Sequence, residues 1–343
     1  MKMFKANLLV AAALAAAAAM PVTSLAAEKA KTWRAQSLWQ SGTLTQAAFE
    51  RFAKDVQEKT KGQISVVPLP AGAIVGANET FDAVSRGILD GQHSAVVYWS
   101  GKNAAFAILG DLNAAYDDPR LAYEYFYNHG GLELLREAYK EHGLFPIGVV
   151  WWGAESIPTN RKVDSPDALK GLKMRLPQGM SSDIFAHYGA VPINLPGSEV
   201  FSALDSGTID ATDWGTLSMN AELGFHDRAK FAICPGIHST PTGDVSIPLK
   251  IWEKLQPETQ KILEQSVQKF GKDMIESLEK ADILAAAKLK KQGVELVDWS
   301  PENRRRFRAT AAQVWVKYGQ QNDLARRAVE GQMTFLRSKG LIK

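Results

Sequence analysis

The sequence predicts an α/β protein that is built from two lobes. Short apolar strands alternate with amphipathic helices along most of the chain, a pattern typical of parallel βαβ units. The 343 residues suffice for two lobes that each have a core of their own. We see no internal repeat, and solenoid architectures are therefore excluded.

The amino-terminal segment has the pattern of an export signal. Lys2 and Lys5 precede an apolar run from Leu8 to Met20, and small residues around Ala26 fit a signal peptidase site. We expect a signal peptide over residues 1–26, cleaved after Ala26 or Ala27, and a periplasmic mature protein. A retained anchor is the rival interpretation, but the run is short and rich in alanine, and no later segment approaches the roughly 20 apolar residues of a membrane span.

The first lobe is expected over residues 27–155 together with 244–275. Apolar alternation predicts strands, and helical spacing of apolar residues between glycine stops predicts helices. The expected strands are Thr32–Leu38, Ile64–Leu69, His93–Tyr98, Leu144–Trp152 and the returning Asp244–Leu249. The expected helices are Leu44 to Gly62, Glu79–Leu89, and a stretch that Asp118 caps and that runs to Gly143 with a break at Gly130-Gly131.

The second lobe is expected over residues 156–243 together with 276–343. Its helices are predicted to begin at Ser165-Pro166-Asp167, to run from Ser181 to Tyr188, and to begin at a capping Ser198. Its strands are predicted over Leu172–Leu176, Val191–Leu195 and Thr208–Trp214. The segment from Pro301 adds further helices.

Helical periodicity persists from Pro257 to Lys291, which is unusually long for a helix of a globular protein. Two interpretations remain open from the residues alone. The stretch is either one long helix or two ordinary helices that are divided near Gly271.

Composition excludes several classes of function. Without Lys2 and Lys5, the 40 basic residues become 38 against 37 acidic ones, a net charge of +1, so nucleic acid is not an expected partner. Cys234 is the only cysteine, and no intramolecular disulfide can form. The sequence lacks His-Glu-x-x-His, Gly-x-Ser-x-Gly, Gly-x-x-x-x-Gly-Lys and Gly-x-Gly-x-x-Gly, so we expect no enzyme.

Two predicted strands end in residues suited to ligand binding. Arg175 ends the strand Gly-Leu-Lys-Met-Arg, and Asp213 and Trp214 end the strand Gly-Thr-Ile-Asp-Ala-Thr-Asp-Trp. Ligands of α/β sheets bind at the carboxyl ends of strands, and a guanidinium suits a carboxylate. The simpler interpretation is that Arg175 lies on a solvated strand face.

These two motifs, at this separation, resemble the solute-binding proteins of tripartite ATP-independent periplasmic (TRAP) transporters. The similarity is greatest to the branch for 2-oxoacids, lactate and aromatic monocarboxylates, and Tyr98-Trp99 and Leu223-Gly224-Phe225 also fit. The resemblance implies a two-lobed periplasmic binding protein in which one long helix spans both lobes. It also implies that Arg175 clamps the substrate carboxylate and that Asp213 is a polar residue of the same pocket.

Aromatic residues near predicted strand ends are candidates for the walls of this pocket. Tyr98, Trp99, Trp152 and Trp214 are expected substrate-binding residues, with Trp151 as a further candidate. Because neighbours on a strand face opposite ways, at most one of Trp151 and Trp152 lines the cleft.

The chain departs from the branch in which a cation bridges protein and substrate. The positions where the family has a glutamine and a glutamate ligand fall on Ala154 and Ser239. Glu155 lies next to the first position and, with Asp213, offers a partial oxygen cage for Ca²⁺ or Na⁺. Alternatively, Glu155 and Asp213 accept hydrogen bonds from the substrate, and the residues leave both interpretations open.

The function expected from this resemblance is capture of a small monocarboxylate by lobe closure and its delivery to membrane permease subunits. The acid is a 2-oxoacid or is lactate-like, pyroglutamate or aromatic. A ligand-gated sensor module, or an enzyme of the same architecture, is the alternative. The protein is expected to be a monomer or a dimer.

Overall fold

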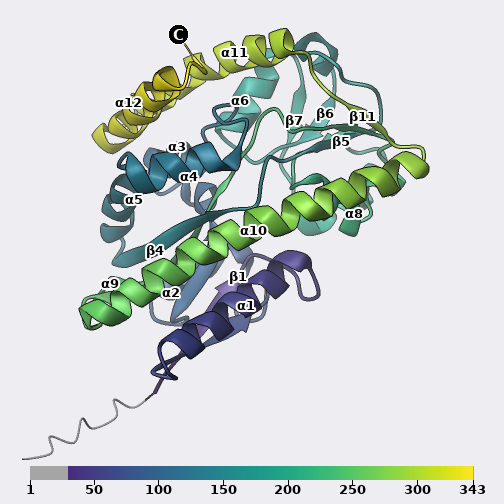
Figure 1. The fold of residues 1–343 in the computed structure, drawn as a ribbon. Helices are drawn as coiled ribbons and strands as arrows, with labels where there is room; N and C mark the ends of the chain where they lie inside the picture. Colours follow the sequence, from purple (N-terminus) through teal and green to yellow (C-terminus); the bar gives the residue numbers. More distant parts are fainter. Residues whose placement is uncertain (1–29, 343) are drawn as a thin grey trace, which may run out of the picture.

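The computed structural model describes residues 30–342, and the predicted signal peptide and its cleavage site lie outside them. Two sheets lie at opposite ends of the molecule, each covered by helices, and one long helix runs across both parts (Figure 1). The predicted two-lobed α/β fold is confirmed. Within residues 30–342, no helix is both long enough and apolar enough to cross a membrane.

The first sheet has the strand order β2-β1-β3-β10-β4. Strands β1, β2 and β3 are parallel, and β10 runs antiparallel between β3 and β4, so the chain returns to the first lobe as predicted. The strands are β1 (Lys31–Ser37), β2 (Ile64–Leu69), β3 (Gly91–Ala95), β4 (Leu144–Trp151) and β10 (Thr242–Pro248). The helices of this part are α1 (Leu44–Lys59), α2 (Thr80–Ser85), α3 (Ala104–Gly110), α4 (Pro119–Asn128), α5 (Gly131–Lys140) and α9 (Leu249–Trp252).

The second sheet has the strand order β11-β9-β5-β8-β6-β7. Strand β6, which carries Arg175, is parallel to both of its neighbours. The strands are β5 (Ile157–Thr159), β6 (Lys173–Arg175), β7 (Val191–Ile193), β8 (Ala211–Thr212), β9 (Phe231–Ile233) and β11 (Glu295–Val297). The helices of this part are α6 (Met180–His187), α7 (Val200–Asp205) and α8 (Leu217–Glu222).

Short 3-10 turns complete the list of elements. They are η1 (Ala77–Glu79), η2 (Val96–Trp99), η3 (Pro166–Leu169), η4 (Gly197–Glu199) and η5 (Phe225–Asp227).

Three connections join the lobes. Residues 152–156 lead from β4 to β5, residues 234–241 lead from β9 to β10, and helix α10 (Pro257–Lys291) contacts α1 and β4 in one lobe and α8 and β11 in the other (Figure 1). Helix α10 is continuous, so the alternative of two helices divided near Gly271 is wrong. A Cβ atom at Gly271 would lie 3.4 Å from the Val149 carbonyl oxygen, and glycine thus allows the helix to pass close to β4.

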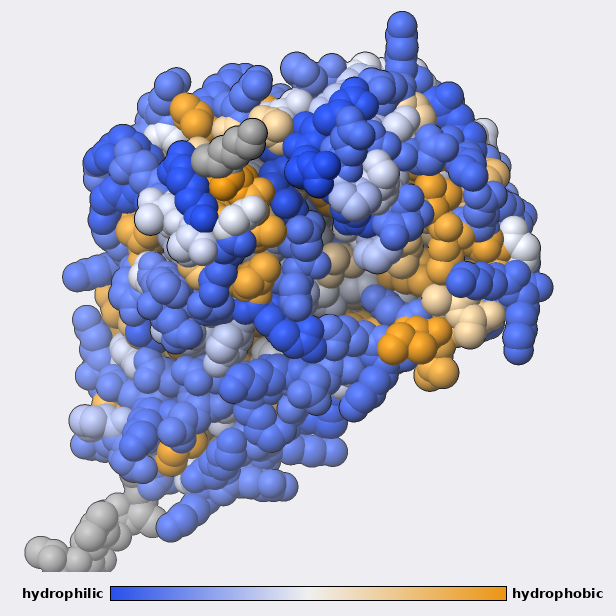
Figure 2. All heavy atoms as spheres, turned by 45° about the horizontal axis from the view of Figure 1, so that its top comes forward, coloured by the Kyte–Doolittle hydropathy of each residue, from blue (hydrophilic) through white to orange (hydrophobic). Residues whose placement is uncertain are grey.

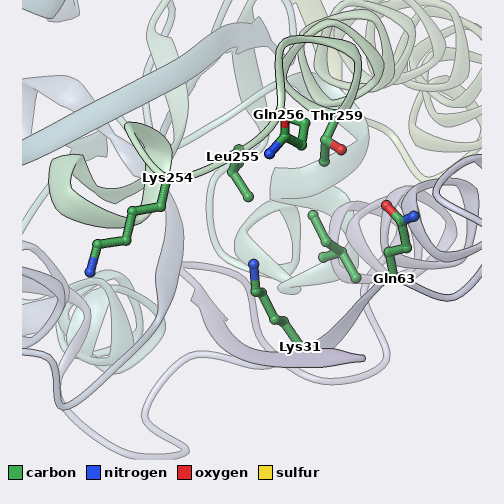
Figure 3. A pocket seen from close by; sticks show the side chains of 7 residues that line it. Lys31, Gln63, Lys254, Leu255, Gln256 and Thr259 are labelled. Carbon is green, nitrogen blue, oxygen red and sulfur yellow. The ribbon is translucent and has the colours of Figure 1, made fainter. Parts of the chain in front are cut away.

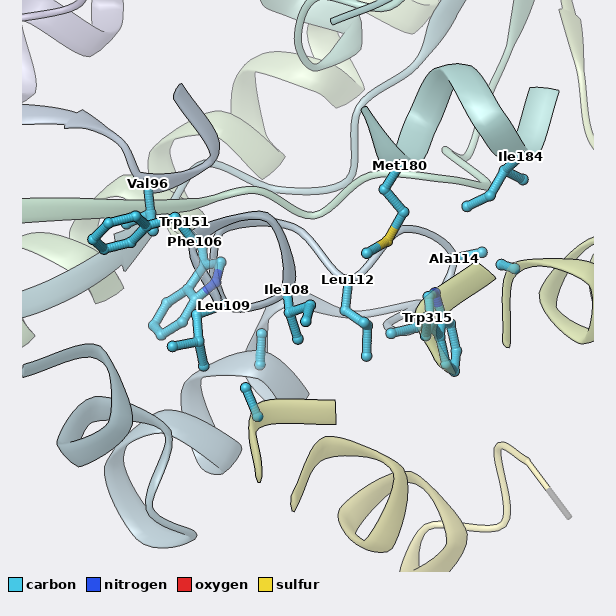
Figure 4. Packing of buried hydrophobic residues seen from close by; sticks show 14 of the residues in the cluster. Val96, Phe106, Ile108, Leu109, Leu112, Ala114, Trp151, Met180, Ile184 and Trp315 are labelled. Atoms are coloured by element: carbon cyan, nitrogen blue, oxygen red, sulfur yellow. The ribbon is translucent and has the colours of Figure 1, made fainter. Parts of the chain in front are cut away.

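The largest apolar cluster extends from the first lobe into the second. Ile108 and Leu109 on α3 pack toward Leu112, and the cluster continues to Met180 on α6 and Trp315 (Figure 4). Helix α11 (Pro301–Gly319) contacts both α6 and α3, and α12 (Asp323–Ser338) contacts α3 and α5. The carboxyl-terminal helices therefore contact both lobes.

The structure corrects several predicted bounds in the first lobe. Strand β3 covers Gly91–Ala95 instead of His93–Tyr98, because the polar side chains before Ala95 are buried and paired. The carboxylate of Asp244 accepts hydrogen bonds from the Gln92 side chain at 2.9 Å and the Ser94 amide at 3.2 Å. The predicted helix Glu79–Leu89 is shortened to a turn and the six residues of α2.

Two predictions in the second lobe were also too long or displaced. Only Ala211–Thr212 of the predicted strand Thr208–Trp214 is paired, and the Asp210 carboxylate instead accepts the Lys173 amide at 2.9 Å. Ser198 lies inside a 3-10 turn and does not cap α7.

The face shown in Figure 2 is largely hydrophilic, with separate apolar patches. Exposed large apolar residues are scattered over several elements, among them Ile283 and Leu284 on α10. Such scatter is normal for a folded protein and by itself indicates no partner.

Candidate functional site

A cavity lies between the lobes, where strands of both sheets end. It is bordered by residues that follow β1, β3 and β4 in the first lobe and by the ends of β6 and β8 in the second. This is the crevice in which α/β sheets bind ligands. The lining residues are Leu38, Trp39, Ala95, Val97, Tyr98, Asp111, Trp152, Glu155, Arg175, Pro177, Ser181, Asp213, Trp214, Ser239 and Pro241.

Arg175 is held at the carboxyl end of β6 and is only 8% exposed, so the interpretation of a solvated strand face does not apply. Its Nε donates to the Leu195 carbonyl at 3.3 Å, and its Nη1 donates to the Asp213 carbonyl at 2.5 Å. The guanidinium lies 5.2 Å from the ring centre of Trp214. Among residues 30–342, nothing accepts a hydrogen bond from Nη2, which leaves donors for a ligand.

Glu155 and Asp213 lie together in the cavity, and both are buried. Burial and the neighbouring Asp213 raise the pKa of Glu155 well above its ordinary value. Burial also acts to raise the pKa of Asp213, but His238, Glu155 and Arg175 outweigh burial and bring that pKa below its ordinary value. The pair therefore favours one proton on Glu155 and a charge on Asp213.

Asp111 is a third buried carboxylate of the cavity, and sequence reasoning missed it. It follows α3 and accepts hydrogen bonds from the Ser239 hydroxyl at 2.7 Å and the Asn113 side chain at 2.7 Å. Burial raises its pKa to about 7. Ser239 thus directs its hydroxyl to Asp111.

His238 is a second residue that sequence reasoning missed. Its Nε2 lies 3.3 Å from the Asp213 Oδ1, and its side chain is fully buried. Neither ring nitrogen makes a hydrogen bond with any residue that the structure describes. The family resemblance places a cation ligand at position 239, and His238 directly precedes that position. This neighbourhood is the one feature of the sequence that could have indicated His238.

Aromatic side chains of the first lobe form the opposite wall. Trp152 lines the cavity, and its Nε1 donates to the Glu155 Oε1 at 3.1 Å. The ring of Trp39 meets that of Trp152 edge to face at 5.0 Å, and Tyr98 lies beside them on η2. Trp39, at the end of β1, was not among the predicted wall residues.

Trp151 and Trp99 lie in the core instead of lining the cavity. Trp151 faces away from Trp152, as neighbours on a strand do, and its Nε1 donates to the Thr242 hydroxyl at 3.2 Å. Trp99 packs on Phe81 with ring centres 5.0 Å apart and is 1% exposed. The predicted strand His93–Tyr98 would have placed Trp99 at a strand end. The chain instead forms the turn η2 at Val96–Trp99, and this turn directs Trp99 into the core.

A pocket at the other end of the first sheet has a different character. Lys31 and Gln63 at the starts of β1 and β2 line it, with Lys254, Gln256 and Thr259 opposite (Figure 3). It lies at the amino ends of parallel strands and contains no carboxylate side chain. The cavity between the lobes is therefore the candidate site.

Comparison with protein families decides the assignment. The family model for bacterial extracellular solute-binding proteins, family 7, matches residues 35–322. The chain belongs to this family. The resemblance to TRAP solute-binding proteins is thereby confirmed.

Individual relatives agree with the family. The chain is 31% identical to the monocarboxylate 2-oxoacid-binding periplasmic protein of Nostoc sp. over 274 residues, which are 79% of this chain and 74% of the relative. It is 35% identical to a TRAP periplasmic solute-binding protein of Rhodobacter sphaeroides, solved in an apo open form, with a TM-score of 0.78 and coverage of 91% and 99%. A TRAP solute-binding protein of Bordetella bronchiseptica, with calcium and picolinate bound, shares the fold at 24% identity and a TM-score of 0.83, with coverage of 91% and 93%.

Members of this family are the binding subunits of transporters and work with membrane permease components. Family 7 proteins are extracellular, and in TRAP systems they are periplasmic. The cavity between the lobes of this TRAP solute-binding protein is thus the place to look for its ligand.

Proposed function

We propose that this TRAP solute-binding protein captures a small organic monocarboxylate between its lobes, with Arg175 binding the carboxylate. The observation that carries the proposal is a buried guanidinium that lines the cavity with unused N–H donors. A planar guanidinium binds both oxygens of a carboxylate, and such bonds strengthen where water is excluded. The 2-oxoacid-binding relative supports this class of ligand.

The neighbouring residues fix the rest of the ligand. Asp213, which carries the charge of the carboxylate pair, holds a second polar group or a cation, and Glu155 assists it. Trp214, Trp152 and Tyr98 provide the apolar walls, which place a 2-oxoacid or lactate-like, pyroglutamate or aromatic body against ring faces. Trp99 is left out of the proposed site because it is buried in the core.

The carboxylates of Glu155 and Asp213 fit a bridging cation. Two acidic groups share one buried cavity, and burial, together with the neighbouring Asp213, raises the pKa of Glu155 because charging both groups there is costly. Bound Ca²⁺ or Na⁺ would supply positive charge to offset that cost and to attract the carboxylate of the cargo. The relative from Bordetella bronchiseptica holds calcium with picolinate.

We further propose that the mature protein acts in the periplasm as a monomer or dimer and delivers its cargo to the permease of a TRAP transporter. The amino-terminal sequence and the family support this location. The family of transporter binding proteins supports binding without turnover. Mass spectrometry of released ligand tests this point, because an enzyme would return a changed compound.

Substitution of Arg175 tests the proposal. Removing one partner of a buried charge pair costs about 2–5 kcal/mol of binding free energy, so Arg175→Ala should abolish ligand-induced thermal stabilisation in a panel of organic acids. Arg175→Lys keeps the charge but loses the planar fork, and it should retain only weak stabilisation. Arg86→Ala, at an exposed position, is the matched control. Wild-type stabilisation of Arg175→Ala would refute the assignment.

A further inference from the structure

We propose that His238 is a third ligand which, with Asp213 and Glu155, makes the cavity a site for a divalent transition-metal ion of the Zn²⁺ class. The inference deepens the proposed function, because it rests on the same cavity and names the kind of cation that would accompany the carboxylate. The three side chains are buried, and one ligand atom from each lies within 4.8 Å of the others.

The geometry around His238 supports a metal ligand. A tetrahedral ion with bonds of about 2.1 Å separates two of its ligand atoms by about 3.4 Å. The Nε2 of His238 lies 3.3 Å from the Asp213 Oδ1, which is within ion-pair distance and matches that ligand separation, while Nδ1 has no partner among residues 30–342. A buried imidazole with an unsatisfied nitrogen is costly unless something binds it.

The surroundings of His238 hold its ring in place. Phe185 on α6 contacts the imidazole edge to face, with ring centres 5.4 Å apart. The adjacent Ser239 hydroxyl donates to Asp111, which fixes the direction of the Ser239 side chain beside His238. On the other side, the Trp152 Nε1 donates to the Glu155 Oε1, and Glu155 shares a hydrogen bond with Asp213 that a bound cation would replace. The position next to the missing glutamate thus adds an imidazole nitrogen to the two carboxylates.

The type of donor decides the class of ion. Ca²⁺ and Na⁺ prefer oxygen ligands, whereas imidazole nitrogen suits Zn²⁺, Ni²⁺ and Cu²⁺. A site of one imidazole and two carboxylates supplies three protein ligands, as in zinc sites that keep a fourth position open. A carboxylate cargo held by Arg175 lies within the same cavity and fits that open position. The protein would then capture a metal–carboxylate pair.

Metal titration of the mature chain tests the proposal. After treatment with chelator, the wild type should bind one Zn²⁺ by calorimetry at least tenfold more tightly than Ca²⁺. Bound Co²⁺ should give the visible absorption bands of a four-coordinate site. His238→Gln should weaken Zn²⁺ binding at least tenfold and change the Co²⁺ spectrum. His226→Gln is the matched control, because His226 is also buried with an unpartnered Nε2 but does not lie with Glu155 and Asp213.

The outcomes are distinct from those of the proposed function. Zn²⁺ binding no tighter than that of Ca²⁺, or equal Zn²⁺ affinity of His238→Gln and wild type, would overturn the role of His238. Pyruvate binding in the presence of chelator is measured in parallel. If pyruvate binds with undiminished affinity under chelator, the metal proposal fails and carboxylate capture stands. If Arg175→Ala binds Zn²⁺ as the wild type does but binds pyruvate equally well too, the metal site stands and the assignment of Arg175 as the carboxylate ligand fails.

Discussion

His93 makes the cavity wall sensitive to acid, and this sensitivity can be measured. The imidazole is fully buried behind the cavity, with Nδ1 2.9 Å from the Asp244 carbonyl and Nε2 accepting the Trp39 indole N–H at 3.0 Å. The contact with Trp39 requires the neutral ring, since the protonated form has no acceptor for the indole N–H, whereas the Asp244 carbonyl accepts from Nδ1 in either form. Burial accordingly lowers the pKa of His93 from 6.5 to about 4.

The magnitude follows from the difference between the two pKa values. A folded pKa below the unfolded one means that the unfolded chain binds more protons, so stability is complete above the unfolded pKa and is lost as the pH falls toward the folded pKa. With 6.5 unfolded and about 4 folded, the free energy of unfolding falls by about 2 kcal/mol between about pH 7.5 and about pH 5. The full loss, reached below about pH 4, is about 3 kcal/mol.

Urea unfolding of the wild type and His93→Gln at these two pH values isolates this contribution. Gln cannot be protonated, so the wild type should lose about 2 kcal/mol more than the variant over the interval. Other titrating groups, His226 and Asp111 among them, are present in both proteins and cancel in the difference. Circular dichroism at about pH 7.5 establishes that the variant is folded. Equal losses in the two proteins would refute the role given to His93.

Two further substitutions test the packing that supports the site. In Gly197→Ala the new Cβ would lie 1.9 Å from the ring of Trp214, which must therefore move away from Arg175. Ligand affinity should fall about 5–30-fold, corresponding to about 1–2 kcal/mol of binding free energy. Gly101→Ala, where nothing lies within 4 Å of the new Cβ, is the control and should bind ligand as the wild type does. An unchanged affinity of Gly197→Ala in calorimetry would contradict the place of Trp214 in the site. The Asp282 carboxylate on α10 accepts hydrogen bonds from the Ser218 amide at 2.7 Å and the Thr216 hydroxyl at 2.8 Å, so Asp282→Ala should lower the free energy of unfolding by about 2 kcal/mol or more. Asp273→Ala, at an exposed position of the same helix, should change it by less than about 1 kcal/mol, and equal effects in chemical unfolding would show that the contact of α10 with α8 is unimportant.

The convergence of Arg175 and Asp213 was predictable, because the carboxyl ends of neighbouring parallel strands meet at one edge of a sheet. Periodicity also indicated β2, with the bounds that the structure has, and the length of α10. The extent of β8 was not predictable, because hydrogen bonds of Asp210 replace those of a ladder there. A polar residue with a local partner ends a strand without any sign in the apolar pattern.

Asp111 and His238 were not predictable for a different reason. Asp111 follows α3 and His238 lies in the connection 234–241, and neither helical nor strand periodicity fixes the direction of these side chains. The proximity of His238 to Asp213 depends on how the connection 234–241 folds back across residues 152–156. The Glu155 amide donates to the Ser239 carbonyl at 3.0 Å, and a Cβ atom at Gly236 would lie 2.3 Å from the Glu155 carbonyl oxygen. This close crossing is a feature of the tertiary structure, and local sequence patterns do not predict it.

The two lobes contribute different groups to the cavity: the second lobe supplies the positive charge, and the first lobe supplies aromatic rings. The positive charge, Arg175, is fixed by backbone carbonyls of the second lobe alone, so the carboxylate of a ligand can bind there without the first lobe. The rings of Trp39 and Trp152 belong to the first lobe and contribute only when they approach the ligand. Glu155 lies on a connection between the lobes and accepts a hydrogen bond from Trp152 at 3.1 Å, so it links the aromatic wall to the charged one. Charge would therefore select the ligand first, and the aromatic wall would then test its shape as the lobes close.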